Sequence, residues 1–158
     1  MAIFIEKLCK NLYSFIYFDF LRKNLSAMRI DHLGIAVKHL DSAISTYEKI
    51  LNQPCYKREV VEEQRVETAF FKTGESKVEL LGATDPDSVI ETFIGKRGEG
   101  LHHVAFEVDD LESEIARLKK EGFTLLNEIP KKGADNKRIV FLHPKQSHGV
   151  LIELCESV

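Results

Sequence analysis

The sequence predicts an α+β fold of two βαβββ modules in tandem, which form one pseudo-symmetric curved mixed sheet with helices on its outer face. Three observations predict it. The chain has 158 residues, enough for one domain or two small modules that share a core. The pattern of residues 32–41 recurs at 103–112. Short strand-like runs follow each copy, which places the modules at about 28–84 and 100–158.

The first module begins with a strand and a helix. Leu33, Ile35 and Val37 alternate with small or polar residues, which indicates a strand with one apolar face. Asp41 is a suitable helix N-cap, and apolar residues follow it at helical spacing. We expect three further strands near residues 56–62, 66–72 and 77–81.

A short connecting helix and a second module follow. We expect this helix to open at Asp85-Pro86, with proline in its first turn. In the second copy Asp109 and Glu112 have the spacing of a capping box, and Gly122 lies where a C-terminal cap belongs. The remaining strands are predicted near residues 124–127, 138–142 and 150–154.

Composition and the N-terminal residues narrow the possible partners. The net charge of -3 gives no electrostatic reason to expect a nucleic acid. The three cysteines are odd in number and far apart, which favours a reducing compartment and a cytoplasmic protein. Residues 1–27 are predicted to be a leader outside the fold. Charged residues interrupt them too often for a membrane span of about 20 apolar residues, although a peripheral amphipathic anchor remains an alternative.

The repeat places two histidines and two glutamates at equivalent positions. In each module a histidine lies near the start of the first strand, and a glutamate lies between aliphatic residues of the last. Side chains alternate along a strand, so if those aliphatic residues face the helices, the polar ones share the concave face. Singly such residues are more often structural, but their paired recurrence predicts a site for Co, Mn, Ni or Zn. The predicted ligands are His32, Glu79, His103 and Glu153.

Several segments resemble the methylmalonyl-CoA epimerase family of the vicinal oxygen chelate superfamily. The similarity extends over residues 28–158 and includes both family signature stretches. It implies the same four metal ligands and inversion at C2 of a methylmalonyl-CoA thioester through a metal-stabilised enolate, with Glu153 as one catalytic base. The segments that carry the resemblance are residues 31–37, 77–81, 98–110, 131–134 and 141–155.

An epimerase also needs a second proton carrier on the opposite face of its substrate. Some family members have a glutamate for this on the strand equivalent to residues 66–72. Alignment of that segment places Thr68 at the position, with Glu67 one residue away and on the other face of the strand. The residues therefore leave the second carrier open.

Coenzyme A carries several negative charges, so basic residues near the last strands are candidate phosphate contacts. His143 and His148 are interpreted as structural or pocket-lining residues. We also expect a homodimer, because a sheet of this size leaves edges that a second chain can cover. The candidate phosphate contacts are Lys131, Lys132, Lys137, Arg138 and Lys145.

Two other functions of the same architecture stay open. Glyoxalase I uses a similar metal site to isomerise a glutathione hemithioacetal. A metal-free protein that sequesters an antibiotic between its modules would have no need for the four ligands together. Extradiol dioxygenases are disfavoured, because they bind iron through two histidines and one glutamate of a single module.

Overall fold

The computed structural model describes residues 28–158, so the predicted leader lies outside the described residues. One mixed sheet contains eight strands in the order β2-β3-β4-β1-β5-β8-β7-β6. The first module comprises β1 (Arg29–Val37), α2 (Leu40–Leu51), β2 (Lys57–Val61), the 3-10 helix η1 (Glu62–Gln64), β3 (Val66–Thr73) and β4 (Ser76–Ala83). After α3 (Val89–Arg97), the second module comprises β5 (Gly100–Glu107), α4 (Leu111–Lys120), β6 (Lys131–Lys132), β7 (Lys137–Leu142), the 3-10 helix η2 (Pro144–Gln146) and β8 (Leu151–Ser157).

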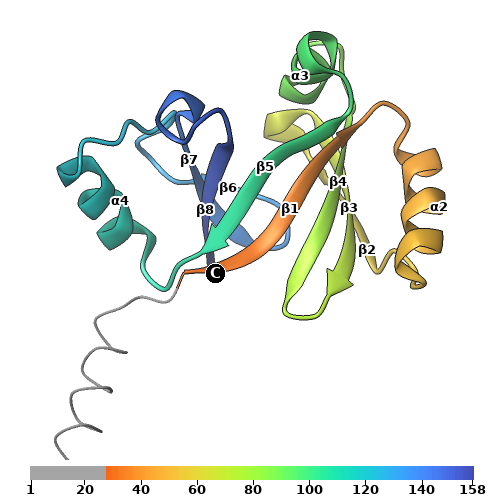
Figure 1. Ribbon diagram of the computed structural model, residues 1–158, viewed down its shortest axis with the longest axis horizontal. Coiled ribbons are helices and arrows are strands. Elements are labelled where there is room, and N and C mark those ends of the chain that lie inside the picture. The colour runs from red at the N-terminus through yellow and green to blue at the C-terminus, as the bar shows by residue number, and fades with distance from the viewer. Residues whose placement is uncertain (1–27) are drawn as a thin grey trace, which may run out of the picture.

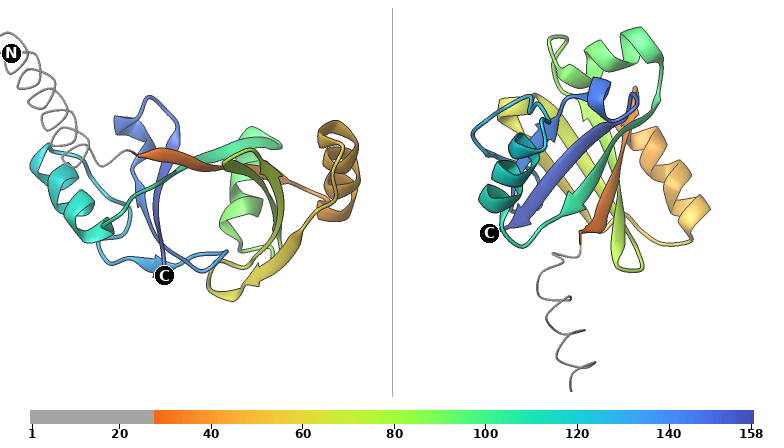
Figure 2. Two further views of the ribbon diagram at one scale, coloured as in Figure 1. Left: turned by 90° about the horizontal axis from the view of Figure 1, so that it is seen from below. Right: turned by 60° about the vertical axis from the view of Figure 1, so that its left-hand side comes forward.

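The two modules meet where β1 and β5 pair antiparallel in the middle of the sheet. Within each module the first strand also pairs in parallel with the last, β1 with β4 and β5 with β8. The sheet curls along its length (Figure 2). Its concave inner face, which we call the cup, lines a cavity. The predicted architecture of two βαβββ modules in one curved sheet is confirmed.

Helices cover the sheet at three places, as Figure 1 shows. The apolar stripe of α2 packs on Val37 and Leu80 of the first module, and that of α4 packs on Leu154 of the second. The connecting helix α3 instead packs at one end of the cup, where Ile90 and Ile94 are buried. The predicted helices on the outer face are therefore α2 and α4.

The helix ends differ from several predictions. Asp41 lies in the first turn of α2, and the N-cap is His39, whose side chain makes no capping hydrogen bond. The α4 cap is Asp110 rather than Asp109, because the Asp110 carboxylate accepts from the Ser113 amide at 2.9 Å. Gly122 does follow α4, with φ 85°, as a C-terminal glycine should.

The connecting helix also starts later than predicted. It begins at Val89, where the Ser88 hydroxyl accepts from the Ile90 amide at 3.2 Å. Asp85-Pro86 instead lies in the turn before it, and the Asp85 carboxylate accepts from the Asp87 amide at 2.8 Å. Asp85-Pro86 has the composition of a helix start, but here it forms the preceding turn.

The strand predicted at residues 124–127 is wrong. Only Leu125 bridges to Leu142 there, and the strand that pairs along β7 is the two-residue β6. Pro130 lies between the two segments and has no amide hydrogen to donate, so it cannot extend a ladder through this stretch. The second module thus has a shorter outer strand than the first.

The structure bears on the inferences about disulfides and membrane spans for residues 28–158 only. Cys55 and Cys155 are both free thiols. Among residues 28–158, no helix has the length and apolar character needed to cross a membrane.

Candidate active site

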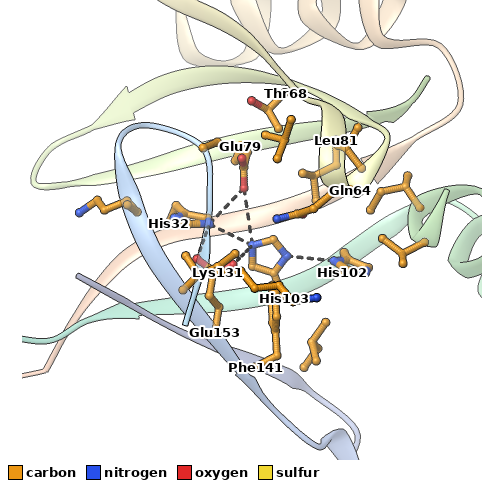
Figure 3. Close-up of a pocket in the computed structure, with 18 of the residues that line it drawn as sticks. His32, Gln64, Thr68, Glu79, Leu81, His102, His103, Lys131, Phe141 and Glu153 are labelled. Carbon is orange, nitrogen blue, oxygen red and sulfur yellow. Dashed lines mark hydrogen bonds and ion pairs between the residues drawn. The ribbon is translucent and has the colours of Figure 1, made fainter. Parts of the chain in front are cut away.

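The four predicted ligands meet inside the cup, as Figure 3 shows. All four residues are almost fully buried, each 4–6% exposed. The Nε2 atoms of His32 and His103 lie 2.9 Å apart. A Glu79 oxygen lies 3.1 Å from the first of these atoms and 3.5 Å from the second. Glu153 oxygens lie 3.8 and 3.7 Å from the same two atoms.

Strand alternation aims the two carboxylates. Val78 and Leu80 belong to the core beneath α2, so Glu79 between them faces the cup. Leu154 belongs to the core beneath α4, and Ile152 packs against it, so Glu153 between them faces the cup as well. Each module therefore contributes one imidazole and one carboxylate, as the repeat predicts.

Two irregularities in the central strand pair bring further polar groups into the cup. The register of β1 against β5 shifts between Ile30 and His32, and again between Gly34 and Ile35. The extra residue is Asp31 in β1 and His102 in β5. At such a bulge two consecutive side chains can share a face. Asp31 and His102 accordingly line the same cavity as the histidines that follow them.

Each of these extra residues contacts the next histidine. An Asp31 oxygen lies 2.8 Å from Nδ1 of His32. The Nδ1 atom of His102 lies 2.9 Å from Nδ1 of His103. Both contacts occupy the nitrogen that faces away from the centre of the site, which leaves Nε2 of each ring toward the other ligands. Neither residue was predicted from the sequence, although the spacing of the repeat also relates Asp31 to His102.

The negative carboxylates of the site and the imidazole of His32 stabilise each other's charged forms. Burial opposes the charged form of His32, but Asp31 and Glu79 outweigh it and raise the pKa of His32 to about 10. Burial would raise the pKa of Glu79, yet hydrogen bonds with both imidazoles lower it to about 2. For Glu153 burial dominates and raises the pKa. In the metal-free protein Glu153 is therefore a stronger base than an ordinary carboxylate.

The donor set fits a divalent metal ion. Two nitrogen ligands about 2.1 Å from one ion and at right angles to each other lie about 3.0 Å apart. The 2.9 Å between the two Nε2 atoms agrees with that separation. Donor atoms of His32, His103 and Glu153 all lie within 4.8 Å of one another, and Glu79 contacts both imidazoles. These four residues would hold the ion, and mixed nitrogen and oxygen ligands suit a first-row transition metal.

A cavity of about 530 Å³ opens beside the four ligands. Its walls include the aromatic rings of Phe70 and Phe141 and the side chain of Thr68, which is 2% exposed. Glu67 lies on the other face of its strand, where Arg58 donates to it at 2.9 Å. The cavity has the size and the mixed polar and apolar lining of a small-molecule site.

The candidate phosphate contacts are distributed on different faces. Lys131 lines the cavity, whereas Lys132 is exposed beside it. Arg138 faces outward and forms ion pairs with Glu112 and Glu156. Lys145 is exposed on η2, outside the cavity lining. Only Lys131 among these four therefore points to the cup.

Lys137 has a different role from a phosphate contact. It is 7% exposed, and its Nζ lies 3.0 Å from Asp31 and 2.8 Å from Glu107. Lys77 of the first module contacts Asp31 as well, at 3.1 Å. This buried ionic network braces Asp31 from both modules. Sequence reasoning missed it because its members are far apart in the chain.

The two histidines near the last strand, His143 and His148, lie outside the cup. The Nδ1 atom of His143 accepts from the Lys145 amide at 3.2 Å and so caps η2. His148 is exposed in the turn after η2. Neither lines the cavity, and the structural interpretation of His143 is confirmed.

Comparison with known proteins agrees with this geometry. Residues 31–141 match the Glyoxalase/Bleomycin resistance protein/Dioxygenase superfamily. The mitochondrial methylmalonyl-CoA epimerase of Homo sapiens is 38% identical over 127 residues, which cover 80% of this chain and 72% of the human protein. The chain belongs to the methylmalonyl-CoA epimerase family.

Solved structures of the epimerase family share this fold. The Mycobacterium tuberculosis enzyme is 37% identical, with a TM-score of 0.78 over 82% of this chain and 87% of that chain. A variant of the Streptomyces coelicolor enzyme in complex with 2-nitronate-propionyl-CoA is 38% identical, with a TM-score of 0.77 over 82% of this chain and 94% of that chain. The epimerase family and the vicinal oxygen chelate fold predicted by the resemblance are thus confirmed.

Proposed function

We propose that this protein is a metal-dependent epimerase that inverts C2 of methylmalonyl-CoA through an enolate. The observation that carries the proposal is the convergence of His32, Glu79, His103 and Glu153 beside the cavity, in a chain of the epimerase family. Relatives 38% and 34% identical bear the epimerase name, and the Streptomyces coelicolor structure holds 2-nitronate-propionyl-CoA.

The chemistry follows from the proton that must move. The C2 proton of the substrate lies between a thioester carbonyl and a carboxylate, and its loss places negative charge on the carbonyl oxygen. A divalent ion among the four ligands would supply the positive charge that stabilises this oxygen. Glu153 is the proposed base, because it is buried at the cavity wall and burial raises its pKa.

Lys131 is the proposed contact for an anionic group of the thioester. Of Lys131, Lys132, Arg138 and Lys145, Lys131 is the one that both lines the cavity and is exposed to an entering ligand. The outward ion pairs of Arg138 with Glu112 and Glu156 already balance its charge.

Exchange of the C2 proton tests the proposed function directly. Methylmalonyl-CoA in deuterated water should gain deuterium at C2 with the metal-loaded protein and lose that exchange after chelation, with return on adding Co²⁺. Methylglyoxal with glutathione should not turn over in a parallel assay. Exchange that survives complete metal removal would contradict the metal dependence, and turnover of only the hemithioacetal would favour glyoxalase I.

We also propose a homodimer that uses the outer face of β1 and β5. Three side-chain pairs lie along this face: Ile30 with Phe106, Leu33 with Val104, and Ile35 with Leu101. Ile30, Leu33 and Leu101 are 44%, 36% and 52% exposed. Ile35 and Phe106 pack partly against the cores beneath α2 and α4, whereas the central part of β1 and β5 between these two helices is uncovered (Figure 1). An apolar stripe of this kind on the central strands suits a second copy of the chain.

A further inference from the structure

His102 and Asp31 occupy the same place in the two modules. Each is the extra residue of a bulge, and each directly precedes a predicted metal ligand. Each also contacts Nδ1 of that ligand, at 2.8 Å for Asp31 and 2.9 Å for His102. A residue in Asp31's position is a familiar support for a metal-binding histidine, because it fixes the tautomer and the orientation of the ring.

The tautomer of His103 decides what its neighbour must do. A neutral imidazole carries one hydrogen, on either Nδ1 or Nε2. If the lone pair of Nε2 faces a cation, the hydrogen of His103 must be on Nδ1. The atom within hydrogen-bond distance of that nitrogen, among the described residues, is Nδ1 of His102. His102 must then accept there and carry its own hydrogen on Nε2.

We propose that His102 is a positioning residue that accepts a hydrogen bond from Nδ1–H of His103 and thereby holds Nε2 of His103 toward the metal ion. This inference rests on the proposed metal site. It makes His102 the counterpart of Asp31, with a neutral acceptor in the second module where the first has a carboxylate.

Packing holds the His102 ring in place. Phe93 of α3 meets it edge to face, with ring centroids 4.9 Å apart and an angle of 83°. Phe141 of β7 meets the His103 ring in a similar way at 5.9 Å. These two aromatic rings restrict the orientation of both imidazoles and so keep their Nδ1 atoms within hydrogen-bond distance of each other.

Three γ-branched replacements of His102 test the proposal. His102→Asn and His102→Asp each keep an oxygen near the position of Nδ1, whereas His102→Leu has the same branching and no acceptor. Loss of a partner of this kind typically lowers metal affinity about 10- to 100-fold. We therefore expect Co²⁺ affinity to fall by about that factor in His102→Leu, and to be retained in His102→Asn and His102→Asp.

The measurement is competition between the intact protein and a chelator for Co²⁺ at fixed pH. Thermal unfolding of the metal-free variants controls for folding, and His39→Leu, at an exposed histidine outside the cup, controls for loss of a histidine. In the Co²⁺-loaded protein, the Nδ1–H proton of His103 should exchange slowly with water in wild type and His102→Asn. It should exchange faster in His102→Leu.

The outcomes separate this inference from the proposed function. Wild-type affinity in His102→Leu, or equal weakening in His102→Asn and His102→Leu, would overturn the role of His102 while leaving the metal-dependent epimerase intact. A wild-type protein that binds no Co²⁺ and exchanges the C2 proton without metal would overturn the metal site, and the role of His102 with it.

Discussion

Glu153 combines two properties at the scale of a single residue. Its oxygens lie 3.7–3.8 Å from the Nε2 atoms of both imidazoles, close enough to share one ion with them, and burial raises its pKa, which makes it a stronger base. Glu79 is equally buried but lies closer to the imidazoles, at 3.1 and 3.5 Å, and its hydrogen bonds with them hold the pKa of Glu79 near 2. The two carboxylates are therefore expected to differ in function.

Replacement of each carboxylate by its amide tests this difference. Glu153→Gln should reduce deuterium exchange at C2 by at least about 100-fold, since the amide cannot take the proton, while an oxygen remains to bind metal. Glu79→Gln is the matched control and should keep exchange, because its amide oxygen can still bind metal and Glu79 is not the proposed base. Exchange is followed by NMR and metal content by elemental analysis. Wild-type exchange in Glu153→Gln would remove this residue from the mechanism.

The ligands could be predicted from the sequence, whereas the residues beside them could not. His32, Glu79, His103 and Glu153 follow from a repeat and from regular strand alternation. Asp31 and His102 break that alternation. Alternation places neighbouring residues on opposite faces, and the bulges that reverse this arise from pairing between β1 and β5, strands that are far apart in sequence.

At the scale of elements, the approach of β1 to β5 depends on Gly34. Gly34 lies directly opposite His103, and a Cβ atom there would come within 2.2 Å of Cε1 of the His103 ring. The bare backbone of Gly34 thus makes the space in which the imidazole lies.

Gly34→Ala should therefore displace the ring and weaken Co²⁺ binding about tenfold or more, with a smaller effect on the melting temperature. Gly95→Ala is the control, since a Cβ atom at this helical position meets nothing within 4 Å. Chelator competition and thermal unfolding measure the two effects. Unchanged affinity in Gly34→Ala would show that the ring has room to move.

Elements were predictable where local patterns sufficed. The apolar spacing identifies α2 and α4, and the alternation identifies β1 and β4. The first residues of helices were harder to predict, because Asp109 and Asp110 are equally good N-caps in sequence and only the backbone path selects Asp110. The prediction of a strand at residues 124–127 was wrong because a strand needs a partner in register, and the residues of the segment itself do not specify one.

At the scale of the whole molecule, a buried ionic network joins the modules. Glu107 accepts from Lys137 at 2.8 Å and from Ser157 at 2.8 Å, and Arg29 pairs with it. Lys77 reaches across to Asp135 at 2.7 Å. Burial opposes ionisation of Glu107, but Lys137 and Arg29 outweigh it and lower its pKa to about 2.

The network should make stability depend on pH in a defined window. A carboxylate with a lowered pKa stabilises the fold above its ordinary pKa of about 4.5, and the effect is lost as pH falls to about 2. The free energy of unfolding of metal-free protein should fall over that range, with at most roughly 3 kcal/mol from Glu107. Glu107→Gln should flatten this dependence, measured by urea unfolding. Glu128→Gln, at an exposed carboxylate, is the control and should keep the wild-type pH dependence. If the free energy of unfolding of Glu107→Gln falls with pH as steeply as that of wild type, Glu107 is not the group responsible.

The proposed dimer face can be tested by one charge. Leu33→Lys places an ammonium group in the centre of the apolar stripe on β1 and β5, so it should convert the dimer to a monomer. Ile50→Lys is the control, because Ile50 is 66% exposed on α2, away from that face. Sedimentation velocity measures the masses. A dimer that persists in Leu33→Lys would place the interface elsewhere, for example at the sheet edges that the sequence suggests.

The paired bulges also bear on the ancestry of the chain. Asp31 and His102 are separated by the same number of positions as His32 and His103, so the inserted residue is most simply explained as older than the gene duplication. A single ancestral module, associating with an identical copy, would already have set two histidines and two acids around a common axis. In the present chain the two sides differ at this position, with an aspartate in one half and a histidine in the other.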